Sequence, residues 1–189
     1  MSQAIIFVGG IHGTGKTTLC RRLALVLSAS HVTAGTLIRE TANSKTTTTG
    51  IRSKAVPDVN ANQELLLRGL ALYRGHTSGP ILLDGHFSLM EPGGTIVDIP
   101  QTVYVAIAPI ALVLVEVDPL VVHSRLTGRD GTAPPLETIA SLCQHERAHA
   151  ELVSKALNIR IFVVRGDIPA EETSQAAASN LRPLLRGVV

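Results

Sequence analysis

Short, continuous apolar runs alternate with longer amphipathic stretches along the 189-residue chain. Apolar runs that do not alternate with polar residues are typical of strands buried on both faces of a parallel sheet. On this basis we predict strands at Ala4–Val8, near His31–Thr33, and at Pro80–Leu83, Ala111–Val117 and Ile161–Val164.

The stretches between these runs have the spacing of apolar residues that is typical of helices. The predicted helices cover Thr18–Ala29, Thr36–Ala42, about Asn60–Gly75, Leu120–Thr127 and Leu136–Leu157, and one more follows Pro169. Asp118 and Pro119 suit the N-cap and first residue of the fourth helix. The alternation of strands and helices predicts an α/β fold, in which a parallel sheet of about five strands has helices on both faces.

The length of the chain and the lack of an evident linker predict a single domain over residues 1–189. The one long polar stretch, Asn43–Val59, is interpreted as a mobile loop within an arm around residues 36–75. Val103–Val117 is almost wholly apolar, but it is shorter than a bilayer span and contains Pro109, so no membrane segment is expected.

Composition narrows the possible partners. The net charge is only +2 and aromatic residues make up 3% of the chain, which makes a nucleic-acid partner unlikely. The two cysteines, Cys20 and Cys143, are expected to be buried, reduced thiols. Together with an N-terminus that lacks the features of a signal peptide, this indicates a cytoplasmic protein. The oligomeric state is left open.

A phosphate-binding loop is the clearest chemical signal. Residues 10–17 read GIHGTGKT, which matches G-x-x-x-x-G-K-[ST] between a predicted strand and a predicted helix. Glycines let backbone N–H groups converge on phosphate oxygens, and the helix N-terminus adds partial positive charge. The predicted ATP phosphate-binding residues are Gly10, His12, Gly13, Thr14, Gly15, Lys16, Thr17 and Thr18. The expected fold is therefore the P-loop NTPase three-layer sandwich.

Asp84 ends the predicted strand Pro80–Leu83 and is the candidate partner of Thr17 at a Mg²⁺ site. Gly85 and His86 follow it, where many nucleotide hydrolases of this class have a glutamate that activates water. The pattern therefore favours phosphoryl transfer to a bound acceptor over hydrolysis.

Three motifs together resemble the nucleoside monophosphate kinases of the adenylate kinase type. They are the loop at residues 10–17, the segment TAGTLIR at 33–39 and the segment RLTGR at 125–129. The resemblance implies ATP and Mg²⁺ as cofactors and small-molecule nucleotides as substrates, most plainly a nucleoside monophosphate as acceptor. It also implies a short lid around residues 126–136.

The resemblance assigns roles to particular residues. Arg39 corresponds to the arginine that holds the acceptor phosphate, and Arg125 and Arg129 correspond to lid arginines that stabilise charge on the transferred group. Planar guanidinium groups suit both tasks. Gly128 is expected to end the helix and free Arg129 to move with a loop. The catalytic set is thus Lys16, Asp84, Arg125 and Arg129. The acceptor-binding set is Thr33, Gly35, Arg39, Asn62, Gln63, Gly85 and His86.

Two alternatives stay open. In the family the acceptor-binding turn has an arginine that this chain lacks after Asp84, which fits a nucleotide-binding regulatory protein or a weak ATPase as well as a kinase. Separately, His145-Glu146-x-x-His149 matches the H-E-x-x-H pattern of zinc hydrolases. Glu146 falls on the apolar stripe of its predicted helix, so we expect it to point inward and to need a partner, for which an arginine in the lid region is the candidate.

Overall fold

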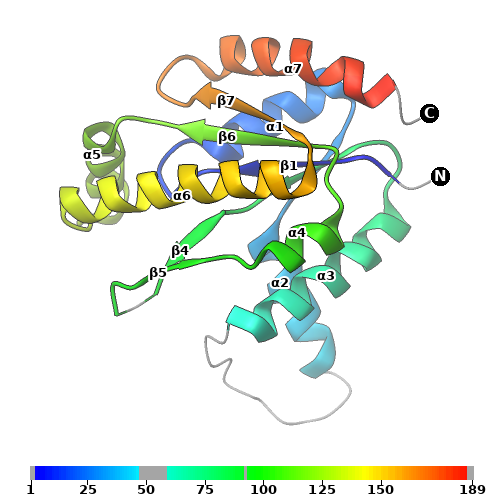
Figure 1. Cartoon of the computed structure of the whole chain (residues 1–189), viewed down its shortest axis with the longest axis horizontal. Coiled ribbons are helices and arrows are strands. Elements are labelled where there is room, and N and C mark those ends of the chain that lie inside the picture. Colours follow the sequence, from blue (N-terminus) through cyan, green and yellow to red (C-terminus); the bar gives the residue numbers. More distant parts are fainter. Residues whose placement is uncertain (1–2, 47–58, 92, 187–189) are drawn as a thin grey trace.

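The structure is a computed structural model, and it describes residues 3–46, 59–91 and 93–186. Five parallel strands form the central sheet in the order β2-β3-β1-β6-β7. Their bounds are β1 Ile5–Gly9, β2 Ser30–Thr33, β3 Ile81–Asp84, β6 Ala111–Glu116 and β7 Arg160–Arg165. All five predicted strands are present, so the predicted five-stranded parallel sheet is confirmed (Figure 1).

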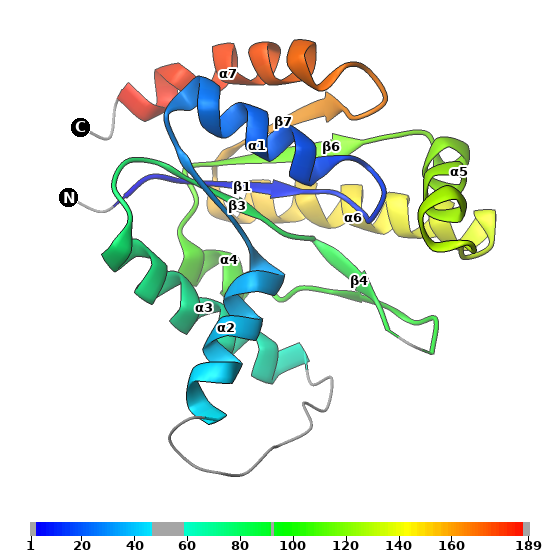
Figure 2. The ribbon, with the colours of Figure 1, turned by 180° about the vertical axis from the view of Figure 1, so that it is seen from behind.

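Helices cover both faces of this sheet, as expected for parallel strands that are buried on both sides (Figure 2). Helices α1 (Lys16–Leu27) and α7 (Ala170–Arg186) pack on one face, around Cys20, Leu23 and Leu181. Helices α2 (Ala34–Thr46), α3 (Val59–His76), α4 (Gln101–Ile107) and α6 (Leu136–Leu157) contribute to the other core. Helix α5 (Pro119–Asp130) packs with α6 in a smaller cluster beside Ile11.

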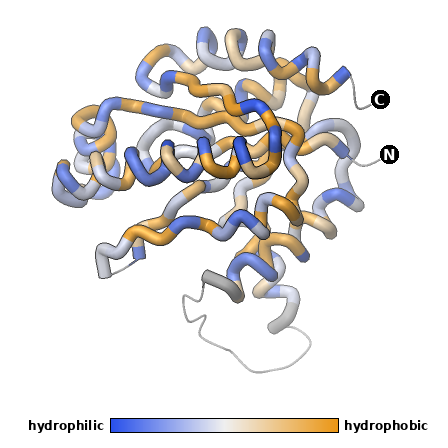
Figure 3. The backbone as a smooth tube through the Cα atoms, in the orientation of Figure 1, coloured by the Kyte–Doolittle hydropathy of each residue, from blue (hydrophilic) through white to orange (hydrophobic). Residues whose placement is uncertain are grey.

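The distribution of hydropathy explains the layers. Figure 3 shows hydrophobic residues concentrated along the central strands, while the helices carry hydrophobic and hydrophilic residues along the same turn. The middle strands β1, β3 and β6 are buried over nearly their whole length. Among the described helices, none combines the length and the apolar character that crossing a membrane requires.

A two-stranded hairpin and one helix are missing from the sequence-based prediction. Strands β4 (Ser88–Met90) and β5 (Ile96–Asp98) form an antiparallel hairpin outside the main sheet. Helix α4 occupies most of the apolar segment before Pro109. Three-residue strands have no readable periodicity, and the apolar run at 103–107 fits a helix and a strand equally well. Both elements border the candidate site.

Several boundaries also differ. Helix α1 begins at Lys16 and ends at Leu27, where Ser28 adopts a left-handed conformation, instead of running from Thr18 to Ala29. The predicted loop at 43–59 is shorter, because α2 continues to Thr46 and α3 starts at Val59, and its remainder, 47–58, lies outside the described residues. Cys20 is buried as expected, whereas Cys143 is partly exposed.

Candidate functional site

The loop between β1 and α1 has the backbone conformation that its glycines permit. Gly13 and Gly15 adopt φ angles of 86° and 87°, which side-chain-bearing residues rarely take. At Gly10 a Cβ would lie 2.5 Å from the carbonyl oxygen of Val115. The glycines thus allow the loop to turn tightly over β6 and to end at the first turn of α1. This is the form of an anion-binding nest at a helix N-terminus.

Lys16, the first residue of α1, is folded back over the loop. Its ammonium group donates hydrogen bonds to the carbonyl oxygens of Gly10 and Ile11, the latter at 2.9 Å. The residue is only 6% exposed, and burial lowers the pKa of its ammonium group. The lysine therefore lies against the concave side of the loop, within reach of any anion bound there.

Thr17, in the first turn of α1, meets Asp84 at the end of β3. The register pairs Val8 of β1 with Asp84 of β3, and this brings the carboxylate beside the start of α1. Thr17 Oγ1 donates a hydrogen bond of 2.8 Å to Asp84 Oδ2. A hydroxyl and a carboxylate oxygen at this distance form an oxygen-only donor set, which fits Mg²⁺.

Arg125 on α5 joins the phosphate loop to the segment after β7. Its guanidinium group donates to the carbonyl oxygens of Gly13, at 3.2 Å, and of Gly166, at 3.0 Å. These residues border a cavity of about 350 Å³ that Gly15 and Thr18 also line. Arg125 is thus positioned beside the loop. We refer to this space as the donor-side cavity.

Arg129 is oriented differently. It forms two hydrogen bonds with the carboxylate of the adjacent Asp130, at 2.7 and 2.6 Å, and it is exposed. The sequence predicted that the helix ends at Gly128. Helix α5 instead continues to Asp130 and is capped by Gly131 with φ 76°. Gly131, and not Gly128, takes the positive φ that ends a helix, so the left-handed cap lies three residues later than expected. Asp118 caps the other end as predicted, accepting a hydrogen bond from the Leu120 N–H at 2.8 Å.

A second cavity, of about 300 Å³, lies on the other side of the loop between α2, α3 and α4. We refer to it as the acceptor-side cavity. Six of the predicted site residues line it: His12, Gly35, Asn62, Gln63, Gly85 and His86. Two others do not. Thr33 Oγ1 accepts a hydrogen bond from the Thr36 N–H at the start of α2, and Arg39 is exposed one turn further on.

Two imidazoles lie where this cavity meets the phosphate loop. The rings of His12 and His86 have centroids 4.4 Å apart, and His86 Nε2 lies 3.5 Å from Lys16 Nζ. Tyr104 Oη donates to the carbonyl oxygen of His86 at 3.0 Å. Burial, with smaller effects from Lys16 and His12, holds the pKa of His86 well below 6.5. His86 is therefore a neutral imidazole at neutral pH.

Glu146 is buried as predicted, but its partner is not an arginine. Its carboxylate accepts hydrogen bonds from three backbone N–H groups: Gly10 at 2.6 Å, Phe87 at 2.9 Å and Ser88 at 2.6 Å. Main-chain donors satisfy a buried carboxylate as well as a cation does, and they leave no trace in the sequence. Glu146 therefore connects α6 to the phosphate loop and to the turn after β3.

These contacts also bear on the H-E-x-x-H pattern. Glu146 is held by main-chain groups, and His149 is buried with Nε2 2.6 Å from the carbonyl oxygen of Ile99. His145 is half-exposed and lies 4.0 Å from Asp98. In the part of the chain that the structure describes, the one compact cluster of potential metal ligands is Cys20, His31 and Asp84, where the thiol is buried and its pKa is raised. The H-E-x-x-H segment, with its buried Glu146, lacks the accessible glutamate that zinc hydrolysis requires.

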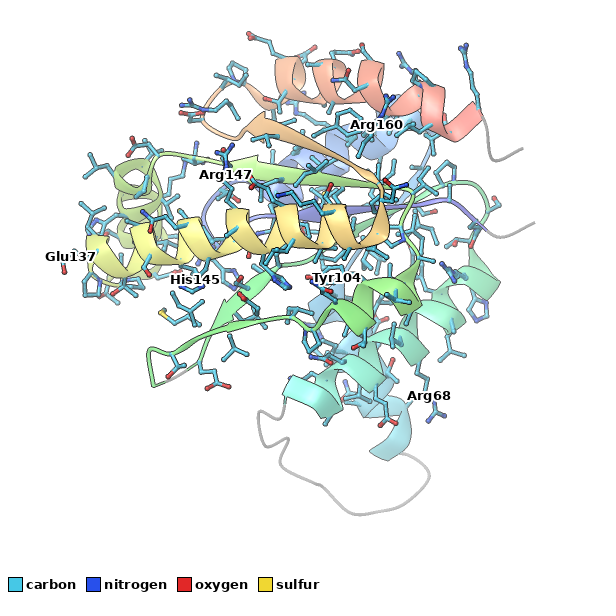
Figure 4. All side chains as sticks on the ribbon, viewed as in Figure 1. Arg68, Tyr104, Glu137, His145, Arg147 and Arg160 are labelled. Carbon is cyan, nitrogen blue, oxygen red and sulfur yellow. The ribbon has the colours of Figure 1, made fainter. Side chains whose placement is uncertain are left out.

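Arg147 on α6 is held in ion pairs. It contacts both carboxylate oxygens of Glu116 at 2.9 Å and Glu151 at 3.2 Å. Figure 4 places Arg147 and His145 on opposite sides of α6, with His145 toward the hairpin and Tyr104 on the neighbouring α4.

Sequence reasoning missed Tyr104 and Gly166, which both border the site. A Cβ on Gly166 would lie 2.1 Å from the carbonyl oxygen of Thr14, so this glycine permits the close approach of the β7 segment to the loop. A glycine two residues after the predicted strand Ile161–Val164, at the same edge of the sheet as the phosphate loop, was the available signal.

Comparison with known proteins agrees with this fold. The family model described as AAA domain matches residues 9–142. A gluconokinase from Sinorhizobium meliloti 1021 aligns over 99% of this chain and 95% of its own, with a TM-score of 0.60 and 15% identity, which is a likeness of fold. No curated protein matches the chain. The five-stranded parallel sheet with its glycine loop at the end of β1 is the P-loop NTPase fold, and the chain belongs to the AAA domain family.

Proposed function

We propose that this protein transfers the γ-phosphoryl group of ATP to a small acceptor, with Mg²⁺ as cofactor. The observation that carries the proposal is the pair of cavities on the two sides of the phosphate loop. Lys16 follows Gly15, which lines the donor-side cavity, and its Nζ is 3.5 Å from Nε2 of His86, which lines the acceptor-side cavity. A phosphotransferase needs two adjoining sites that meet at the transferred group, whereas a hydrolase needs only one and a water molecule.

The residues around the loop have the chemistry for this reaction. Binding of the ATP phosphates would replace the carbonyl oxygens of Gly10 and Ile11 as partners of Lys16. Arg125 lies in place beside the donor-side cavity, whereas Arg129 would have to leave Asp130 to reach the nucleotide. Thr17 and Asp84 would hold Mg²⁺, which neutralises charge on the β and γ phosphates when bound.

The turn after Asp84 supports transfer over hydrolysis. The next residues are Gly85 and His86, with no carboxylate that could activate water. Both residues line the acceptor-side cavity instead. An acceptor held there brings its own nucleophilic oxygen. The protein then has mainly to position the acceptor and to screen the charge of the phosphates.

Two acceptors follow from the resemblances. A nucleoside monophosphate follows from the adenylate kinase-like motifs, and a sugar acid follows from the gluconokinase of similar fold. Arg39, the residue expected to hold an acceptor phosphate, is exposed on α2 and does not line the cavity. The proposal therefore concerns phosphoryl transfer itself and does not depend on either acceptor.

The test is an assay of ADP formation coupled to detection of the phosphorylated product by ³¹P NMR. The panel contains the ribonucleoside monophosphates, gluconate and uncharged alcohols. We expect one class to give product stoichiometric with ADP, and Lys16→Ala to lower kcat by at least about 100-fold, because transition-state charge loses its main cation. Lys155→Ala, at an exposed lysine in the last turn of α6, is the matched control.

Unchanged turnover in Lys16→Ala would contradict the proposal. ATP binding without any phosphorylated product, combined with nucleotide-dependent capture of a protein partner, would favour the regulatory alternative. ADP and inorganic phosphate formed in equal amounts, at a rate that no acceptor changes, would indicate an ATPase.

A further inference from the structure

The walls of the acceptor-side cavity are predominantly apolar. Ile38 from α2, Leu66 from α3 and Leu89 from β4 line it, together with Val103 and Ile107 from α4. The ring of Tyr104 forms a further wall and is itself stacked against Phe87, with centroids 5.5 Å apart. Walls of this kind, with few polar groups, recognise a compact apolar body by burying its surface.

The described residues that line this cavity include no lysine, arginine, aspartate or glutamate. A phosphate or carboxylate moved from water into such surroundings needs cations or several N–H donors to compensate for lost hydration. Lys16, whose Nζ is 3.5 Å from His86 Nε2, lies at the phosphate loop, where the donor phosphates would engage it. The described lining of the cavity is therefore suited to the uncharged part of an acceptor and not to a second phosphate.

One polar group in the cavity lacks a partner. Gln63 Nε2 is buried and makes no hydrogen bond to any described residue. A buried donor without an acceptor is unfavourable, which is why such groups in native proteins are commonly partnered by a ligand or water. Gln63 lies on α3 and lines the cavity, so a hydrogen-bond acceptor on a bound molecule would satisfy it.

Chemistry would occur where the cavity meets the phosphate loop. His86 lines the cavity and adjoins Lys16, whose ammonium group reaches the phosphate loop. A hydroxyl placed at His86 would therefore lie at the boundary with the donor-side cavity. Apolar walls, the free amide of Gln63 and the adjoining phosphate loop together define what can bind.

We propose that the acceptor is an uncharged, largely apolar small alcohol, whose body fills the acceptor-side cavity and whose hydroxyl points to His86 and Lys16. A carbonyl or ether oxygen on the same molecule accepts a hydrogen bond from Gln63. This inference rests on the proposed phosphoryl transfer. The hydroxyl oxygen bonds to the γ-phosphorus of ATP, the bond from that phosphorus to the β–γ bridging oxygen breaks with its electrons leaving on ADP, and the hydroxyl proton is released to water.

Two alcohols that differ in one group provide the test. The aromatic hydroxyketone 2-hydroxy-1-phenylethanone and the simple alcohol 2-phenylethanol share a phenyl ring and a primary hydroxyl, but only the hydroxyketone has a carbonyl oxygen. Each is offered to the full-length protein with MgATP beside the nucleoside monophosphates and gluconate. We expect ³¹P NMR to detect phosphate esters of both alcohols and a lower KM for the hydroxyketone.

Gln63→Leu keeps the size of the side chain and removes the amide. We expect it to raise the KM for the hydroxyketone about tenfold and to leave kcat unchanged, because about 1.4 kcal/mol of ground-state binding is lost. The KM values for ATP and for the simple alcohol should not change. A merely structural role for Gln63 would change the KM for both alcohols together. Gln175→Leu, at an exposed glutamine on α7, is the control.

The outcomes separate the two proposals. Product from nucleoside monophosphates or gluconate, with none from either alcohol, would overturn the acceptor class and leave phosphoryl transfer standing. Absence of product from the whole panel would overturn both. Equal changes for the two alcohols in Gln63→Leu would overturn the assignment of Gln63.

Discussion

The carboxylate of Glu146 accepts a hydrogen bond of 2.6 Å from the backbone N–H of Gly10, a residue 136 positions away in the chain. The same carboxylate accepts from Phe87 and Ser88. One buried side chain of α6 thus fixes the start of the phosphate loop relative to the turn that borders the acceptor-side cavity. The contact has consequences for stability and for the relative placement of the two cavities.

Glu146→Gln is expected to destabilise the protein by about 2–4 kcal/mol, because the amide NH₂ is a donor that faces N–H groups and leaves some of them unsatisfied. Urea unfolding measures the change. Glu151→Gln, an exposed position on the same helix, should shift the free energy of unfolding by less than about 0.5 kcal/mol. Equal stability of the two variants would show that the three backbone contacts are not important for the fold.

Gly166→Ala is expected to weaken ATP binding at least about tenfold, because the added methyl group would lie 2.1 Å from the Thr14 carbonyl oxygen and must displace the phosphate loop. Isothermal titration calorimetry with ATP measures it. Gly128→Ala is the matched control: nothing lies within 4 Å of its Cβ, so binding should be unchanged and α5 slightly more stable. Normal ATP affinity in Gly166→Ala would contradict the close approach.

Asp84→Asn is expected to raise the Mg²⁺ concentration for half-maximal nucleotide turnover at least about tenfold, since a neutral amide is a weaker ligand for a hard cation than a carboxylate. A Mg²⁺ titration at constant ATP gives the value. Asp167→Asn, an ion-paired aspartate outside the proposed Mg²⁺ site, should leave it unchanged. An unaltered Mg²⁺ requirement in Asp84→Asn would remove this residue from the metal site.

Tyr104→Phe tests the buried phenol. At neutral pH the loss of the hydrogen bond to the His86 carbonyl oxygen is expected to destabilise the protein by about 1 kcal/mol. Burial, with added effects of Glu146 and Asp98, holds the pKa of Tyr104 well above 10.0. Above pH 10 the unfolded chain loses this proton while the folded protein keeps it. The parent protein therefore loses stability through this phenol as pH rises, and the variant, which has no phenol at this position, does not.

The difference in unfolding free energy between parent and Tyr104→Phe should therefore shrink between pH 8 and pH 11, as measured by urea unfolding. Other titrating groups are common to both proteins and cancel in the difference. A difference that grows with pH would mean that the phenol ionises more easily in the folded state.

The fold could be predicted well because its signals are local. Continuous apolar runs such as Ile81–Leu83 identify buried strands, and the spacing of GIHGTGKT specifies the loop and the helix that follows. The hairpin Ser88–Met90 and Ile96–Asp98 could not be found in this way, because its strands are too short to show alternation.

The acceptor side was harder to predict because it depends on long-range contacts. Gly85, His86, Asn62 and Gln63 do gather around one cavity, whereas Arg39 is exposed and does not line it. Helical phase alone does not place an arginine on α2 when the neighbouring helices are unknown. The partner of Glu146 was wrong for a related reason, since backbone amides are the same at every position and only the folded chain determines which of them converge.

In the structure Lys16 already has two carbonyl partners, Gly10 and Ile11, within its own loop. A nucleotide must therefore compete for this lysine, and the exchange is favourable only for ligands that carry more negative charge than two neutral carbonyl groups. The loop in this way resists occupation by weak or singly charged anions. These two contacts also organise the loop before a nucleotide binds, so the nucleotide does not have to supply that free energy.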